Sequence, residues 1–72
     1  MIPIGKKGQI IQGESPGWFV LVQDNSVNTG GFLILTAEDR EFKGKGFDNW
    51  VENKEALEQF FRFAKWEIDW LE

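Results

Sequence analysis

Residues 17–35, "GWFVLVQDNSVNTGGFLIL", contain two runs of consecutive apolar side chains with a polar stretch between them. The runs are rich in Val, Ile, Phe and Trp, which favour strands, and the polar stretch is rich in Asp, Asn, Ser and Gly, which favour turns. The pattern predicts an antiparallel hairpin. Neither run alternates apolar with polar residues, as a strand with one face in water does. Both faces of this hairpin therefore need a cover.

Successive side chains of a strand point to opposite faces, so the hairpin divides into two apolar sets. One face carries Phe19, Leu21, Leu33 and Leu35. A single helix can cover one of the two faces, and the sequence offers no obvious second helix for the other. Three covers remain open: the segment 37–52 folds over it, a second copy of the chain packs there, or a different protein does. In the second case these four residues form the self-association surface.

The helix is predicted from Asn53, a good N-cap residue, to Ala64. Its apolar residues recur at intervals of three and four, which is helical periodicity; they are Leu57, Phe60, Phe61 and Ala64. The following "WEIDW" alternates apolar with acidic residues, which predicts a strand over residues 66–70. The alternative is a helix that continues to the C-terminus, which places Phe63, Trp66 and Trp70 together on a different side, facing water. The lack of Gly or Pro between the two elements supports that alternative, but the alternation favours the strand.

Two further segments complete the expected fold. "QIIQ", residues 9–12, lies between turn residues and predicts a short strand. Residues 37–52 are predicted to form a long loop that Phe42, Phe47 and Trp50 hold against the body. Residues 1–72 are thus expected to form a single α+β domain. It has a small antiparallel sheet of three to four strands with one helix packed across it, in the order hairpin, long loop, helix and C-terminal strand.

Composition excludes several classes of function. The 72 residues include no Cys and no His, which removes disulfides, thiolate nucleophiles, Cys/His zinc sites and histidine bases. The apolar fraction of 42% is that of a globular chain. Neither a signal-peptide h-region nor a run of about 18 apolar residues is present, so we expect a cytoplasmic protein with no membrane association.

Three features of the sequence resemble metal, phosphate or catalytic sites, and each lacks residues or spacing that such a site needs. Residues 24–28 place oxygen-bearing side chains at alternate positions, as a calcium loop does, but Leu35 stands where the closing Glu belongs. "GKGFD", residues 44–48, lacks the spacing of a phosphate-binding loop. Acidic residues are numerous, yet no carboxylate pair stands out for acid/base catalysis. We therefore expect no metal, no cofactor and no enzymatic activity.

Charge indicates the kind of partner. Residues 37–72 hold ten acidic and six basic residues, which accounts for the whole net charge of −4. Such a surface repels phosphate backbones, so nucleic-acid binding is not expected. A basic protein is the more compatible partner.

The predicted partner-binding residues combine an aromatic ring with acids: Asp39, Glu41, Asp48, Trp50 and Glu52. Trp is enriched at binding hot spots, and here it is flanked by carboxylates. The leading hypothesis is a small acidic, non-enzymatic protein-binding module that occludes a basic partner, as an inhibitor or an immunity or antitoxin protein does. The alternatives are a homodimeric structural protein that buries the second sheet face and, third, a carboxylate-based enzyme.

Overall fold

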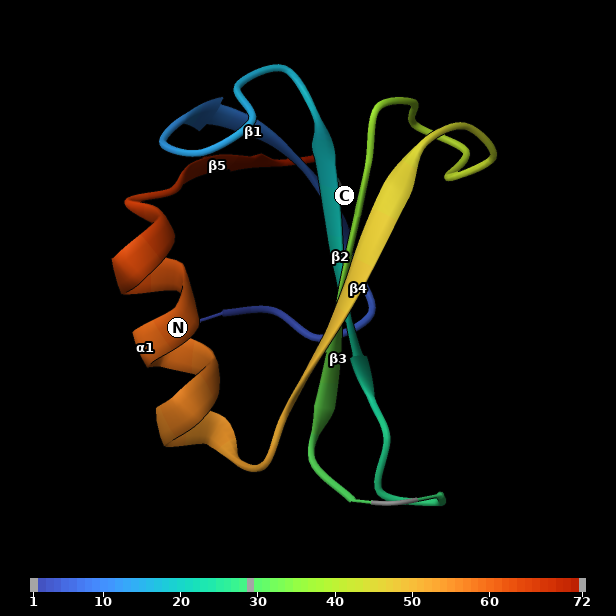
Figure 1. Cartoon of the computed structure of the whole chain (residues 1–72), viewed down its shortest axis with the longest axis vertical. Helices are drawn as coiled ribbons and strands as arrows, with labels where there is room; N and C mark the ends of the chain where they lie inside the picture. Colours follow the sequence, from blue (N-terminus) through green and yellow to red (C-terminus); the bar gives the residue numbers. More distant parts are fainter. Residues whose placement is uncertain (1, 29, 72) are drawn as a thin grey trace.

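The computed structural model describes residues 2–28 and 30–71, which form one antiparallel sheet and one helix (Figure 1). In these residues the sheet has five strands, in the order β4-β3-β2-β1-β5. The elements follow the chain as β1 Lys7–Gln12, β2 Phe19–Asp24, β3 Phe32–Ala37, β4 Gly46–Val51, α1 Lys54–Ala64 and β5 Glu67–Trp70. The α+β class, the hairpin, the helix and the C-terminal strand are as predicted from the sequence.

The prediction of one long loop over residues 37–52 is wrong, because it contains β4. This strand pairs with β3 over its whole length, from Phe32 opposite Val51 to Ala37 opposite Gly46. The sheet therefore has five strands and not three to four. The sequence "GFDNWV" contains Gly, Asp and Asn, which are depleted in strands. Phe47, Trp50 and Val51 favour a strand, so local preference is divided, and the continuous pairing with β3 makes this segment a strand.

The core lies between the sheet and α1, which crosses one side of it (Figure 1). Its fully buried side chains come from the central strands and the helix: Ile10, Val20, Val22, Ile34 and Leu57. The N-terminal segment also belongs to this layer, since Ile2 packs against the cluster and the Gly5 N–H donates to the Val22 carbonyl oxygen at 2.7 Å. One face of the hairpin is thus covered by the helix and the N-terminal segment together.

The N-terminus of α1 agrees with the sequence prediction. Asn53 is the N-cap, and its side-chain oxygen accepts the Ala56 N–H at 2.8 Å. Glu55 lies in the first turn, where the positive end of the helix dipole favours an anion. The helix has eleven residues, and no helix in the described part of the chain is long and apolar enough to cross a membrane.

The change from helix to strand without Gly or Pro is made by Lys65. This residue adopts the left-handed conformation with φ 56° and ψ 37°, and its N–H and that of Trp66 bond back to the carbonyls of the last helical turn. The turn after β1 also contacts this end of the helix: the Glu14 N–H donates to the Ala64 carbonyl, and its own carbonyl accepts the Trp66 indole N–H at 2.8 Å. The helix thus ends without a glycine at the left-handed position, and hydrogen bonds of Glu14 connect its end to the turn after β1.

The alternation in "WEIDW" is used as predicted. Trp66 and Trp70 pack against Phe61 with ring centroids 4.9 and 6.4 Å away, while Glu67 and Asp69 are exposed. Phe63 on the outer side of α1 is 84% exposed. Because the helix ends at Ala64, Trp66 and Trp70 pack against the core and do not join Phe63 on the exposed side of a longer helix.

Candidate functional site

The sheet face turned away from α1 is apolar and only partly covered. Strand register shows which residues share it, because directly opposite residues lie on the same side. Leu21 is opposite Leu35, and Leu33 is opposite Trp50. All of them except Trp50, which is exposed, are half-buried. We call this surface the open face and define it by Phe19, Leu21, Leu33, Leu35, Asp48 and Trp50. The four residues predicted for self-association therefore lie together on it.

Trp50 is the aromatic anchor of the open face. Half of its surface is exposed, yet its indole N–H donates to the Gly30 carbonyl oxygen at 2.8 Å. Gly30 belongs to the turn between β2 and β3, so this bond connects the edge strand to the neighbouring hairpin. A Trp ring held in place loses little conformational entropy on binding, which is why such residues serve as hot spots.

The loop of residues 38–45 covers only one end of the open face. Phe42 is half-buried there and lines a shallow hollow with Leu35, Ala37 and Asp48. The Lys7 ammonium lies 5.6 Å from the centre of the Phe42 ring, within range of a cation–π contact. Leu33 and Trp50 lie toward the opposite end of their strands, two residues further from this loop. The segment predicted to fold over the second face thus does so in part.

Asp39 organises this loop. Its carboxylate accepts the Gly44 N–H at 2.7 Å and the Lys43 N–H at 3.1 Å, and these bonds hold the pKa of Asp39 below its ordinary value. The carboxylate is consequently already engaged inside the chain. Glu41 in the same loop is exposed. The predicted binding acids therefore divide into a loop pair, Asp39 and Glu41, and a second set along β4.

The second set lies at one edge of the molecule. Asp48 and Trp50 alternate with Phe47 and Asn49 along β4, so they share the open face, and Glu52 follows the strand. All three are exposed. The structure thus brings together Asp48, Trp50 and Glu52 and leaves the loop acids at the other end of β4.

Phe47 is an exposed aromatic that sequence reasoning treated as a loop anchor. It is 67% exposed and lies on the opposite side of β4 from Trp50, where it stacks on Trp18 with ring centroids 6.0 Å apart. Phe47 and Trp50 are three residues apart, so a strand places them on opposite faces. The sequence predicted a loop for this segment and therefore did not indicate that the two rings lie on opposite faces. Only the pairing with β3 shows it.

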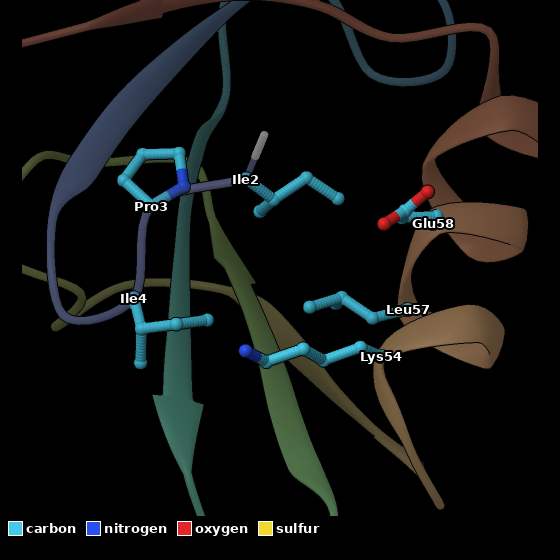
Figure 2. A pocket seen from close by; sticks show the side chains of 6 residues that line it. All are labelled: Ile2, Pro3, Ile4, Lys54, Leu57 and Glu58. Atoms are coloured by element: carbon cyan, nitrogen blue, oxygen red, sulfur yellow. The ribbon is translucent and has the colours of Figure 1, made fainter.

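A small pocket lies between the N-terminal segment and α1 (Figure 2). Its volume is about 190 Å³, and it is lined by Ile2, Pro3, Ile4, Lys54, Leu57 and Glu58. Figure 2 shows Ile2 and Leu57 pointing toward one another across it. Pockets for small-molecule ligands usually measure roughly 300 to 1,000 Å³. This pocket is smaller than that range and lies between the N-terminal segment and α1.

The resemblance of residues 24–28 to a calcium loop is explained by the turn itself. The Asp24 carboxylate accepts the Ser26 N–H at 2.8 Å, which lowers the pKa of Asp24, and the Asn28 side chain donates to that of Asn25. Within residues 2–28 and 30–71 no three acidic side chains gather closely enough to hold a metal ion. A general acid needs a raised pKa, and the shifts at Asp24 and Asp39 have the opposite sign.

No protein-family model matches this chain, and no curated protein or solved structure matches it either.

Proposed function

We propose that this chain is a small acidic protein-binding module without enzymatic activity, which binds a basic partner through the open face and β4 and thereby occludes it. The observation that carries the proposal is the anchored, half-exposed Trp50 beside Asp48 on an apolar sheet face. This combination of a rigid aromatic, an apolar floor and flanking charge is that of a binding hot spot. Inhibitors and immunity or antitoxin proteins act by such occlusion.

Charge supports the basic character of the partner. The open face and its margins carry Asp48, Glu52 and, on the far strand, Asp69. Lys7, on the same side of the sheet, lies over Phe42 and is half-buried. With a net charge of −4 for the whole chain, a basic partner is attracted before contact, and its association rate falls as salt rises.

The test compares variants of the binding surface with a variant elsewhere that changes the charge equally. Trp50→Ala and Asp48→Lys should each weaken binding of a protein captured from a cell extract, Trp50→Ala by about 30-fold or more. Glu67→Lys on β5, at the far edge of the sheet, should change binding much less. Equal affinity of Trp50→Ala and the unmodified chain would refute the proposal.

The second candidate is a homodimer that buries the open face and serves as a scaffold. Half-buried Leu21, Leu33 and Leu35 favour it, since contiguous apolar surface of this kind often marks an interface. Sedimentation equilibrium over a wide concentration range distinguishes the two. A homodimer gives a mass that rises with concentration, a melting temperature that does the same, and little dependence on salt.

A further inference from the structure

β4 is an edge strand of the sheet, and within residues 2–28 and 30–71 no strand pairs with its outer side. The Glu38 N–H donates to the Lys45 carbonyl at 2.9 Å, next to the β3–β4 ladder and in the same register. Hydrogen-bonded pairs alternate along an antiparallel ladder, so Phe47, Asn49 and Val51 bond to β3. The backbone N–H and C=O groups of Asp48 and Trp50 consequently point away from the sheet.

The opposite edge, β5, has protections that β4 lacks. β5 has four residues, its pairing with β1 contains a register shift, and its exposed side chains, Glu67 and Asp69, are both acidic. Short length, irregular pairing and charge are the usual means of preventing strand addition. β4 has six residues, contains no Pro or Lys, carries one charged side chain, Asp48, and pairs with β3 in one continuous register.

Side chains on both faces of β4 would gain cover from an added strand. Phe47 is 67% exposed on the helix side and Trp50 is 50% exposed on the open face. A strand paired with the outer edge of β4 places its own alternate side chains beside each of them. The backbone groups and both exposed aromatics therefore favour the same kind of occupant, an extended segment.

Charge decides between a second copy and a different protein. If β4 paired with β4 of a second copy, two symmetric antiparallel registers would overlap the strands most. In one register Asp48 lies directly opposite Asp48 of the copy, and in the other the two lie diagonally. Two negative charges at either spacing disfavour the pairing. A segment with Lys or Arg on that face meets Asp48, with Glu52 just beyond it, and its cationic heads also reach the Trp50 ring. The surface fits a basic segment better than it fits itself.

We propose that β4 is the docking edge for an extended basic segment of the partner, which adds to the sheet as a further strand. This inference rests on the proposed function and specifies how the partner is bound. Main-chain hydrogen bonds to Asp48 and Trp50 supply the affinity, and the alternation of side chains supplies the specificity.

The probe is a six-residue peptide of alternating valine and lysine, acetylated and amidated, with a valine and glutamate peptide of the same length as control. Amide chemical shifts and hydrogen exchange of the full chain are followed by NMR at millimolar peptide. Exchange should slow at the Asp48 and Trp50 amides with the lysine peptide. The Phe47 and Asn49 amides, already bonded to β3, should not gain protection. Protection at Ile68 and Trp70 of β5 instead, or at neither edge, overturns the inference.

A proline variant tests the backbone contribution. Asp48→Pro removes an outward N–H and leaves the β3 ladder intact, which edge strands tolerate, and it should abolish peptide protection at Trp50. Asp48→Asn should retain protection and lose only the preference for lysine over glutamate. If Asp48→Pro does not fold, an ester in place of the Asp48 amide, made by chemical synthesis, removes the same donor.

The same variants separate this inference from the proposed function. Suppose that a natural partner does not bind Trp50→Ala but binds Asp48→Pro as well as it binds Asp48→Asn. The open face then binds the partner through side chains, and the inference of strand addition is wrong. If neither variant affects the partner, both the inference and the proposed function are wrong. Loss with both variants and retention with Asp48→Asn supports both.

Discussion

Two adjacent residues of β3, Leu33 and Ile34, test whether the sheet really has one covered and one open face. Ile34 has no exposed surface and contacts the cluster beneath α1, so Ile34→Asp buries a carboxylate without a partner. That costs about 3 to 5 kcal/mol, in addition to about 2 kcal/mol of lost apolar burial. A chain of this length has a total stability of about 4 to 11 kcal/mol. Ile34→Asp should therefore remove a large part of the free energy of unfolding, about 5 to 7 kcal/mol.

Leu33→Asp should be tolerated. Leu33 is half-buried on the open face, so the new carboxylate keeps contact with water and only part of the apolar burial of a leucine is lost, about 1 kcal/mol. Urea unfolding at low micromolar concentration, followed by tryptophan fluorescence, measures both variants. If Leu33→Asp destabilises the chain as severely as Ile34→Asp, the second face is covered and the reasoning is refuted. The urea midpoint is then measured again at higher protein concentration. If it rises for the unmodified chain and not for Leu33→Asp, a second copy covers this face.

Three further predictions concern single residues. Lys65→Gly should raise the free energy of unfolding by about 0.5 to 1 kcal/mol, because glycine adopts the left-handed conformation there without steric cost; an unchanged urea midpoint would contradict this. Gly8→Ala should lower stability by about 1 to 3 kcal/mol, since the added methyl group meets the Ile68 side chain and the Trp70 ring, and the near-ultraviolet circular dichroism of the tryptophans should change with it. The pKa of Asp39 is lowered on folding, so its contribution to loop stability is complete above the ordinary value of 3.8 and is lost as pH falls through the lower folded pKa. Asp39→Asn should loosen the Gly44 amide already at neutral pH and remove this acid dependence, as hydrogen exchange of that amide would show.

Much of the fold follows from local signals in the sequence. The Asn53 cap and the apolar stripe of Leu57, Phe60, Phe61 and Ala64 define the helix, because side chains three, four and seven residues apart share one helical face. The alternation of the acidic Glu67 and Asp69 with the apolar Ile68 and Trp70 defines the last strand for the analogous reason at a period of two. The two-sided apolar character of the hairpin was also evident, and with it the prediction that one face needs a cover beyond the helix.

The candidate site was predictable in part. The proximity of Asp48, Trp50 and Glu52 follows from their spacing along one segment, which sequence alone shows. Their position beside Leu33 and Leu35 required the β3–β4 pairing. Asp39 was grouped with them by charge, whereas its carboxylate binds the Gly44 amide within its own loop. Charge along a sequence does not reveal which carboxylates are already hydrogen-bonded.

The sequence by itself therefore determined the helix, the hairpin and the final strand, because their residue types and apolar spacing match the period of the element that each forms. Only the tertiary structure decided the rest. β4 forms because the apolar edge of β3 needs a partner, although Gly46, Asp48 and Asn49 have no local preference for a strand. Lys65 takes its left-handed conformation at a helix end that Glu14, from a distant turn, also contacts through the Ala64 carbonyl. In each case the contact joins segments whose own residue preferences do not reveal it.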